Sequence, residues 1–487
     1  MSHNANVQCL NVASKEQKRN IVDKSDGRFL ANPPPSIHKE RQLAEITSFS
    51  GSHMSKSLRL GIAGLGTVGV GVLDLLHSHA KAIATRAGKK VEVTGVSARD
   101  RRKNRRHDLS KLAWFNDPVA LAKSPDIDVF VELIGGEDGP AKAAVEAALN
   151  AGKPVITANK ALLAHHGASL ARLAEAKGVV LNFEASVAGG IPIIKTLREG
   201  LAGNRVGKLF GILNGTCNYI LTKMANEGRS FADVLKEAQA LGYAEADPAF
   251  DVGGFDTAHK LAVLTALAFG VEVNLKAIDI EGIEAITLDD IRNAGDLGYK
   301  IKLLGVAVAH GEGIEQRVHP TLVPKGSPVA DTDGVFNAVV VKGDFVGDLM
   351  LEGRGAGAHP TASAVISDVV DIARGNFRPA FGVPATELRP YRDAPKKAHE
   401  GGFYVALELH DRPGAVAAIA GILADGKISI ESIVQRGKLE KDTPRTVAPF
   451  ILITHDTLET AMRAALVRIE KDGHVASKPR MIRIERL

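Results

Sequence analysis

Short apolar runs alternate with amphipathic stretches downstream of residue 56. The run over 58–63 predicts a buried strand, and a glycine-rich turn and a helical stretch through His79 follow it. The same alternation predicts further strands over 91–96, 125–133 and 154–157, and helices over 141–150 and 163–177. Strands and helices that alternate at this spacing predict a parallel, doubly wound α/β sheet, here a Rossmann-type domain over residues 55–187.

The pattern becomes mixed in the middle of the chain. Helical periodicity predicts helices over 191–201, 231–241 and 255–269, and strand-like alternation predicts strands over 306–310, 316–322 and 338–341. This mixture predicts a separate α+β substrate domain over residues 188–393. We expect its C-terminal helix, near 361–375, to return to the first domain.

The C-terminal part has its own order of elements. Residues 394–402 contain a proline, two lysines and a glycine pair, and are interpreted as a linker. Over residues 403–487 the pattern predicts strand, helix, two strands, helix and strand. This βαββαβ order is that of a ferredoxin-like domain.

Residues 1–54 have no sustained periodicity, contain a run of three prolines and end in Gly51-Ser52-His53-Met54. They are interpreted as a disordered N-terminal extension or an expression tail, although an extended start upstream of the true Met54 would look the same. A targeting peptide is less favoured because the segment contains several acidic residues and no apolar core.

Composition narrows the class of protein. Of the 487 residues, 45% are hydrophobic and 24% charged, which is typical of a folded protein. No apolar run approaches the roughly 18–20 residues that cross a bilayer, so no membrane span is expected. A net charge of +5 and an aromatic content of 5% give little basis for nucleic-acid binding. The two cysteines, Cys9 and Cys217, lack metal or redox spacing, which favours a reducing cytoplasm.

A Gly64-x-Gly66-x-x-Gly69 pattern follows the first predicted strand and opens the first helix. In that position the first glycine permits a tight turn, the second lets the backbone approach a pyrophosphate, and the third allows close packing of helix on strand. The motif is weak alone, and a purely structural turn is the alternative. Its context predicts that Gly64, Gly66, Thr67, Val68 and Gly69 bind a dinucleotide at the helix N-terminus.

No acidic residue ends the second predicted strand, where one would bind the ribose 2′-hydroxyl of NAD. Ser97 and Arg99 stand there instead, and they suit a 2′-phosphate. We therefore favour NADP over NAD, with Arg99 as the candidate contact. The arginines that follow are interpreted as a solvated basic loop: Arg101, Arg102, Arg105 and Arg106.

Asp256 and Lys260 are four residues apart on a predicted helix and therefore share one face. On spacing alone an ordinary helix ion pair is favoured. The surroundings shift the balance, because four carboxylates fall within twelve residues, at positions 245, 247, 251 and 256. Such a concentration suits a cationic group on a substrate.

Five segments occur in an order that is typical of a known family. They are Gly64–Gly69, 157–160 (Thr-Ala-Asn-Lys), 184–192, 211–219 and 251–260. Together they resemble homoserine dehydrogenase over residues 58–375. The C-terminal segment, with Asp411-Arg412-Pro413-Gly414 before a helix, is similar to an ACT regulatory domain, an arrangement found in the longer monofunctional bacterial type.

This resemblance implies NAD(P)-dependent interconversion of L-homoserine and L-aspartate 4-semialdehyde in threonine and methionine biosynthesis. It implies that Lys260 is the acid–base residue, with Asp256 beside it, and that Lys160 lies near both cofactor and substrate. Glu245 corresponds to the partner of the substrate ammonium, and Gly357 to a cofactor contact. The chemistry agrees, because a lysine ammonium can polarise a carbonyl and donate the proton that its oxygen needs.

The family also binds a monovalent cation, usually sodium. The corresponding ligands are the Glu184 side chain and the carbonyls of Val187, Gly189 and Ile191, all hard oxygen donors. The resemblance further implies L-threonine as an allosteric ligand of the ACT domain and a homodimer or homotetramer.

Two other functions remain open. Cys217 could be the nucleophile of an acylating aldehyde dehydrogenase, although no activating histidine is evident beside it. Alternatively, the chain could be an amino-acid-sensing protein with a vestigial dinucleotide domain, which the intact Gly64, Lys160 and Lys260 argue against. His165, His166 and His259 are interpreted as surface or core residues and not as ligands.

Overall fold

The computed structural model describes residues 56–244, 247–311, 313–395, 399–435 and 447–485. Within these ranges no helix is both long and apolar enough to cross a membrane. Glu245 lies outside the described residues, as does the whole segment 1–54.

The N-terminal sheet has six strands in the order β3-β2-β1-β4-β5-β6, and every paired neighbour is parallel. The strands are β1 (Leu58–Ala63), β2 (Val91–Ser97), β3 (Ala113–Phe115), β4 (Val129–Glu132), β5 (Val155–Thr157) and β6 (Leu181–Asn182). The chain reverses its direction of winding between β1 and β4, which is the switch point where ligands bind in open α/β sheets. The predicted Rossmann-type fold is confirmed.

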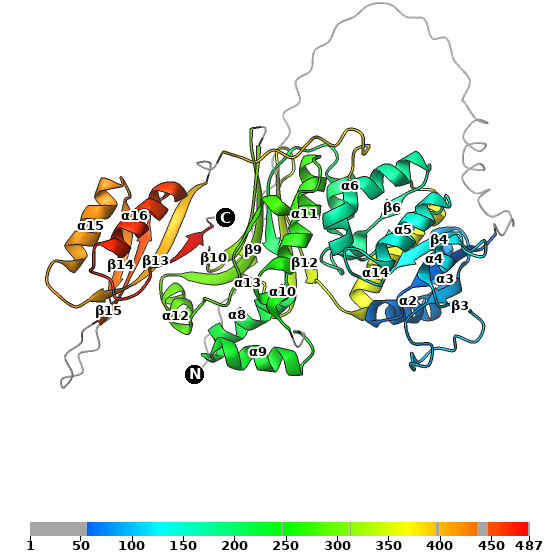
Figure 1. The fold of residues 1–487 in the computed structure, drawn as a ribbon, viewed down its shortest axis with the longest axis horizontal. Helices are drawn as coiled ribbons and strands as arrows, with labels where there is room; N and C mark the ends of the chain where they lie inside the picture. The colour runs from blue at the N-terminus through cyan, green and yellow to red at the C-terminus, as the bar shows by residue number, and fades with distance from the viewer. Residues whose placement is uncertain (1–55, 245–246, 312, 396–398, 436–446, 486–487) are drawn as a thin grey trace, which may run out of the picture. The chain divides into compact units, whose positions relative to one another are not determined.

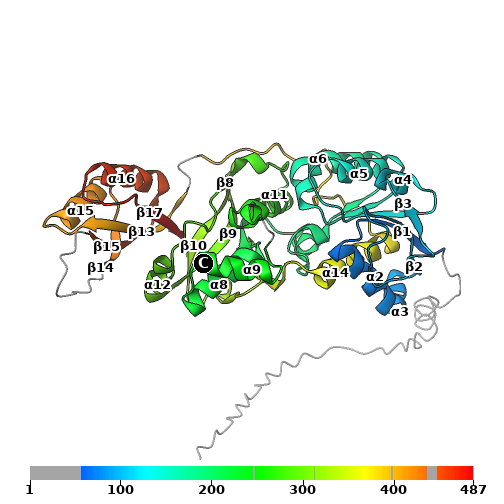
Figure 2. The same ribbon diagram turned by 60° about the horizontal axis from the view of Figure 1, so that its bottom comes forward.

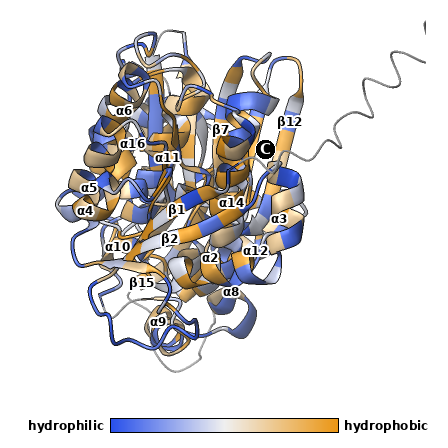
Figure 3. Cartoon of the chain, turned by 90° about the vertical axis from the view of Figure 1, so that its right-hand side faces the viewer, coloured by the Kyte–Doolittle hydropathy of each residue, from blue (hydrophilic) through white to orange (hydrophobic). Residues whose placement is uncertain are grey.

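Helices cover both faces of this sheet (Figure 2). One face carries α2 (Thr67–Ser78), α3 (Ala80–Ala87) and α14 (Ala358–Arg374), and the other carries α4 (Pro118–Lys123), α5 (Pro140–Asn150) and α6 (Lys160–Ala176). Because both faces are buried, β4 is apolar at consecutive positions, with Val129 and Val131 on one face and Phe130 on the other. Figure 3 shows orange, hydrophobic stretches along β1, β2 and α14.

Helix α14 follows the middle part of the chain in sequence but packs on α2 and α3, which cover the first sheet (Figure 1). Gly71 makes this approach possible, since a Cβ there would lie 2.6 Å from the Ala358 carbonyl oxygen. The hydrophobic pattern predicted neither β3, α3 nor α4, because these elements have only three, eight and six residues and are too short to show a sustained period.

The middle of the chain forms a mixed sheet with α8 and α11 packed against it. Its strands are β7 (Val206–Ile212), β8 (Ile278–Ile280), β9 (Tyr299–His310), β10 (Gly313–Pro324), β11 (Phe336–Gly343) and β12 (Gly347–Arg354). Its helices are α7 (Ile193–Lys195), which continues as a π-helical turn (Thr196–Gly200), α8 (Gly215–Glu227), α9 (Phe231–Ala240), α10 (Ala249–Val252), α11 (Phe255–Phe269), α12 (Leu288–Asp296) and α13 (Pro328–Asp331). The helix predicted over 255–269 is confirmed residue for residue.

The C-terminal elements have the predicted βαββαβ order, with one additional two-residue strand, β16, before the second helix. They are β13 (Glu400–His410), α15 (Ala415–Asp425), β14 (Ile430–Gln435), β15 (Val447–Thr454), β16 (Thr457–Leu458), α16 (Glu459–Lys471) and β17 (Arg480–Ile484). Strand β13 begins inside the segment interpreted as a linker.

The C-terminal sheet also continues the mixed sheet, because β17 pairs in parallel with β10 at Thr321 and Leu322. Next to this junction Glu485 is buried and forms ion pairs with Arg317 and Lys208. Sequence analysis did not predict that the two sheets join.

Two glycines inside helices offer a test of the contact between α2 and α14. Gly71→Ala is expected to lower the melting temperature, because its Cβ would collide with the backbone of Ala358. Gly421→Ala in α15 is the matched control, because nothing lies within 4 Å of its added Cβ. Its melting temperature should not fall, since alanine stabilises a helix by about 1 kcal/mol relative to glycine. Differential scanning calorimetry on both variants would contradict this packing if their melting temperatures moved together.

Candidate active site

The turn between β1 and α2 requires glycine at two of the three glycine positions of the motif. Gly64 has φ of +102°, and a Cβ there would lie 2.2 Å from the Leu133 carbonyl oxygen. A Cβ at Gly69 would lie 2.1 Å from the Gly64 carbonyl oxygen. In contrast, no atom lies within 4 Å of a Cβ placed at Gly66. A side chain at Gly64 or Gly69 would therefore collide with the backbone, whereas the space beside Gly66 is open.

The N-terminus of α2 faces this open side. Gly66 caps the helix without any side-chain hydrogen bond, and Gly66 and Thr67 are exposed, whereas Val68 is half-buried. An uncapped helix N-terminus offers free N–H groups and a partial positive charge to an anion. The residues present thus fit the pyrophosphate of a dinucleotide.

Gly357 occupies a similar place at the start of α14. It has φ of +117° and caps α14 without a side-chain hydrogen bond. The next residue, Ala358, contacts Gly71 of α2. The return of α14 therefore brings Gly357 to the dinucleotide-binding domain, which the motif alone could not show.

Glu132, which sequence analysis did not select, shapes the neighbouring turn at the end of β4. Its side chain is fully buried and accepts hydrogen bonds from the backbone N–H groups of Ile134 (2.7 Å) and Gly135 (3.0 Å) and from the Thr157 hydroxyl (2.5 Å). The available signal was an acidic residue near the end of the predicted strand 125–133, because a carboxylate buried there needs hydrogen-bond partners.

Lys160 begins α6 directly after β5. Asn159 fixes this helix start: its Oδ1 accepts from the Leu162 N–H (3.1 Å), and its Nδ2 donates to the Gly136 carbonyl (2.7 Å). The Thr-Ala-Asn-Lys segment thus ties the ends of β4 and β5 together. Gly64, Glu132 and Lys160 all lie at the carboxyl edge of the parallel sheet.

Asp256 joins Lys160 to Lys260. Its Oδ1 lies 2.8 Å from Lys160 Nζ, and its Oδ2 lies 2.8 Å from Lys260 Nζ. Asp256 and Lys260 are both buried on α11, whereas about a third of the Lys160 side chain is exposed. The pair that spacing alone favoured as a simple helix ion pair is therefore part of a three-residue cluster between two domains.

Backbone and amide groups complete the cluster. Lys260 Nζ also donates to the Leu213 carbonyl (2.7 Å), and Asn214 Nδ2 donates to Asp256 (2.8 Å) and to Asp251 (2.8 Å). Leu213 and Asn214 lie in the 211–219 segment, so that segment positions the lysine and both carboxylates.

The two carboxylates differ in their electrostatics. Burial tends to raise the pKa of Asp256, but Lys260 and Lys160 outweigh burial and hold that pKa well below its usual range. Burial and then the negative charge of Asp256 raise the pKa of Asp251. Asp256 is consequently a fixed anion that can keep two ammonium groups in place.

The other acids of this region contribute less to the described geometry. Asp247 is exposed and accepts a hydrogen bond from the Ala249 N–H (3.1 Å). Its neighbour Glu245, the predicted ammonium partner, is outside the described residues.

Arg99 and Arg105 differ sharply. Arg99 is exposed just beyond the end of β2, beside the buried Ser97. The interpretation of Arg105 as solvated was wrong: it is buried and donates to the carbonyls of Leu65 (3.2 Å) and Asp100 (2.6 Å), with its guanidinium 5.6 Å from the centre of the Trp114 ring. Arg105 therefore anchors the basic loop to the glycine-rich turn, a contact between distant residues that no local pattern reports.

Glu184 is the only carboxylate among the four predicted cation ligands. It is buried, and its two oxygens accept hydrogen bonds from the backbone of Ile194 (3.0 Å) and Lys195 (2.9 Å). Burial and then the charge of Asp368 raise the pKa of Glu184 to about 7. A nearby cation would favour the charged form of this carboxyl group, so the surroundings of Glu184 fit a cation site.

The three carbonyls belong to the turn after Glu184. Val187, Gly189 and Ile191 are all buried, and a Cβ at Gly189 would lie 2.7 Å from Thr361 Oγ1 of α14. One carboxylate and several backbone carbonyls form a hard donor set that fits a monovalent cation.

Cys217 lies close to the cluster but does not fit a nucleophile. Its side chain is fully buried, its thiol donates to the Asp251 carbonyl (3.2 Å), and burial followed by the charge of Asp251 raises its pKa well above the usual value. A nucleophilic cysteine needs an accessible thiolate. The geometry therefore opposes the acylating dehydrogenase.

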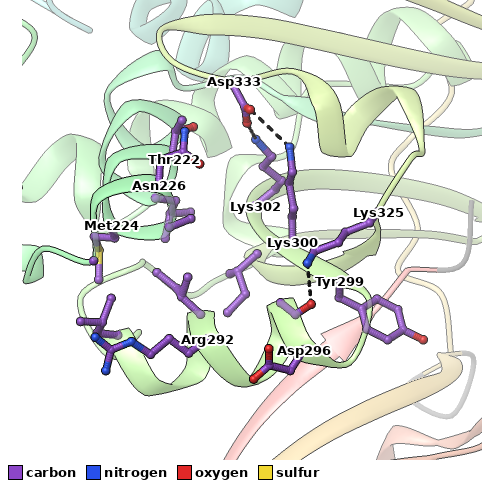
Figure 4. A pocket seen from close by; sticks show the side chains of 17 residues that line it. Thr222, Met224, Asn226, Arg292, Asp296, Tyr299, Lys300, Lys302, Lys325 and Asp333 are labelled. Carbon is purple, nitrogen blue, oxygen red and sulfur yellow. Dashed lines mark hydrogen bonds and ion pairs between the residues drawn. The ribbon is translucent and has the colours of Figure 1, made fainter.

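A separate cavity of about 340 Å³ lies between α8, α12 and β9 (Figure 4). None of the predicted site residues lines it. Its lysines have partners of their own, since Lys300 and Lys302 both point to Asp333 and Lys325 donates to the Gly295 carbonyl. The cavity is therefore not part of the candidate site.

A glycine cradle on a Rossmann sheet, with Lys160 at its carboxyl edge joined to Lys260 through one buried aspartate, is typical of an NAD(P)-dependent oxidoreductase. Comparison with known families specifies which one. Models described as "Homoserine dehydrogenase, NAD binding domain", "Homoserine dehydrogenase" and "ACT domain" match residues 64–184, 192–370 and 403–470.

Similar proteins agree with these models. Homoserine dehydrogenases of Neisseria gonorrhoeae and Pseudomonas aeruginosa are 44% and 45% identical over 438 residues, which cover 89% of this chain and 99% and 100% of theirs. The crystal structure of a homoserine dehydrogenase from Thiobacillus denitrificans has a TM-score of 0.83 and 45% identity, covering 88% of this chain and 98% of that chain. The chain belongs to the homoserine dehydrogenase family.

A more distant structure bears on the cofactor. A hyperthermophilic archaeal homoserine dehydrogenase in complex with NADPH has a TM-score of 0.57 and 25% identity, covering 66% of this chain and 99% of that chain. As a member of this family, the chain is an NAD(P)-dependent enzyme with a C-terminal ACT domain, and the amino-acid sensor with a vestigial dinucleotide domain is not favoured.

Proposed function

We propose that this chain interconverts L-homoserine and L-aspartate 4-semialdehyde with Lys260 as the acid–base residue. The observation that carries the proposal is the position of Asp256 between Lys260 and Lys160, buried and 2.8 Å from both ammonium groups. The direct test is to incubate the enzyme with L-homoserine and NADP and to measure the absorbance of the reduced nicotinamide.

Lys260 moves the proton at the reacting oxygen. Two of the three donors of its ammonium are used by Asp256 and the Leu213 carbonyl. The third donor serves the substrate oxygen, which it polarises and protonates during aldehyde reduction. When bound, the nicotinamide supplies or accepts the hydride at the adjacent carbon.

The remaining residues bind and orient. Lys160, at the carboxyl edge of the sheet, contacts both substrate and cofactor in this proposal, and Glu245 binds the substrate ammonium. Gly64, Gly66 and Gly69, with Thr67 and Val68 at the start of α2, receive the pyrophosphate. In the cofactor site, Arg99 binds the 2′-phosphate of NADP and Gly357 lies beside the cofactor. The ligands of Na⁺ are Glu184, Val187, Gly189 and Ile191.

The cation would act on structure more than on chemistry. Glu184 and the turn through Ile191 lie between Asp368 of α14 and the backbone of α7. A cation held there would offset the buried charge and fix the junction between the dinucleotide-binding and catalytic parts.

Regulation and assembly follow from the same family assignment. We propose domains at 55–187, 188–393 and 403–487, a homodimer or homotetramer, and a cytoplasmic enzyme of threonine and methionine biosynthesis. L-Threonine is the proposed ligand of the ACT domain, bound where Gly414 caps α15 without a side-chain hydrogen bond.

Lys260→Ala is expected to abolish most turnover in both directions, since general acid–base catalysis contributes about 10²–10⁴-fold. NADPH affinity should change little, because Lys260 is not part of the glycine cradle. Steady-state kinetics and a fluorescence titration with NADPH measure the two quantities. A variant that keeps more than about a tenth of wild-type activity would leave Lys260 as a helix ion-pair residue.

Arg99→Ala is expected to weaken NADP binding by about tenfold or more while NAD binding changes little, because hydrogen bonds to charged groups contribute about 1.5–3 kcal/mol each. Arg102→Ala, on the same exposed loop, is the control. KM values for both cofactors give the measurement, and equal losses for NADP and NAD would point to a general defect of the loop.

Gly414→Asp is expected to remove inhibition by L-threonine and leave catalysis intact, because a new carboxylate would repel the carboxylate of the effector at the N-terminus of α15. Aspartate tolerates the left-handed conformation at this residue, φ +91°, better than most residues. Gly421→Asp on the same helix, also open around its Cβ, is the control. Unchanged inhibition in Gly414→Asp would mean that threonine acts at the active site.

A further inference from the structure

Phe250 of α10 touches the lysine cluster from outside. Its ring is 43% exposed, and Lys160 Nζ lies 5.8 Å from the ring centre. The ring of His259 meets it edge-on, with centres 5.3 Å apart and an interplanar angle of 87°. The Phe255 ring stacks on it with centres 6.5 Å apart and an angle of 21°. An ammonium within about 6 Å of a ring centre is attracted by the ring quadrupole.

His259 supports Phe250 from the buried side. It is 8% exposed, and its Nδ1 is buried without a hydrogen-bond partner in the described residues. Its ring also packs edge-on against the His165 ring of α6, with centres 5.6 Å apart, and His165 Nε2 lies 2.9 Å from a Glu137 carboxylate oxygen. The aromatic contacts thus join α10, α11 and α6, the helix that Lys160 begins.

The charge state of His259 agrees with this packing. Burial lowers the pKa of His259, and the nearby His165 and Lys160 lower it further against the opposing effects of Asp256 and Glu137. A neutral imidazole can pack against an aromatic ring and does not repel the Lys160 ammonium. His259 is therefore a structural support and not a second cation in the cluster.

Lys160 needs such support more than Lys260 does. Lys260 is buried on the same helix as Asp256, whereas Lys160 comes from another domain and its side chain is one-third exposed. A flexible four-carbon side chain loses much freedom when one geometry is imposed on it. An aromatic face beside the ammonium restricts that freedom without using a hydrogen-bond donor that the substrate needs.

We propose that Phe250, held by His259, is a positioning residue that fixes the Lys160 ammonium for substrate binding through the face of its ring. The inference rests on the proposed function of Lys160 and goes beyond it by assigning a role to α10. It accounts for an exposed aromatic ring next to a charged cluster, which sequence analysis had assigned no function.

The test is a set of substitutions that distinguishes an effect of the aromatic face of Phe250 from an effect of side-chain size. Phe250→Leu is expected to lower kcat/KM for homoserine about three- to tenfold, the range of an exposed to partly buried cation–π contact, mainly through KM. Phe250→Tyr keeps the ring face and should restore most of the loss. Phe255→Leu removes the ring that stacks on Phe250 and leaves the Phe250 face beside Lys160 in place, so activity should stay within about twofold of wild type.

A double-substitution cycle gives the second measurement. If Phe250 acts through Lys160, Phe250→Leu should have little further effect on kcat/KM in a Lys160→Met background. An undiminished effect there, no effect of Phe250→Leu, or failure of Phe250→Tyr to restore activity would each overturn the inference. NADPH affinity and melting temperature monitor folding, and an inactive wild-type enzyme would refute the proposed function instead.

Discussion

The site depends on the pairing of the buried Asp256 carboxylate with its ammonium and amide partners. A buried anion is tolerated only when it is paired and hydrogen-bonded, and removing one partner of such a pair costs about 3–5 kcal/mol. Here the partners come from three places: Lys260 from the same helix, Lys160 from the first domain and Asn214 from the segment before α8. The need to satisfy one carboxylate therefore brings together the elements that form the active site.

The same constraint explains why the first two domains are interwoven. Lys160 can reach Asp256 only if α6 packs against α11, and this packing is present. Helix α14 adds a second connection, because it leaves the catalytic sheet and packs on α2, with Gly71 and Gly189 permitting its close approach. Contacts at both points fix the dinucleotide cradle relative to the lysines, which is what a hydride transfer between two bound molecules requires.

The ACT domain is connected by a different device. Strand β17 extends the catalytic sheet beside β10, and the buried Glu485 pairs with Arg317 and Lys208 next to the junction. A continuous sheet transmits small displacements of one strand to its neighbours, because packed elements rearrange between discrete states and do not deform freely. The ACT domain is therefore hydrogen-bonded to the sheet that packs against the helix of Asp256 and Lys260.

Local patterns in the sequence determined the order of most elements, the glycine turn and the shared face of Asp256 and Lys260, because strand and helix periodicity and i, i+4 spacing are properties of neighbouring residues. Resemblance to a family then pointed to Lys160, Glu184 and Gly357. Only the tertiary structure decided that Lys160 meets Asp256, that Arg105 is buried against the glycine turn and that β17 joins β10. Each of these contacts joins residues far apart in the chain, and their meeting depends on how whole elements pack, which no local period records.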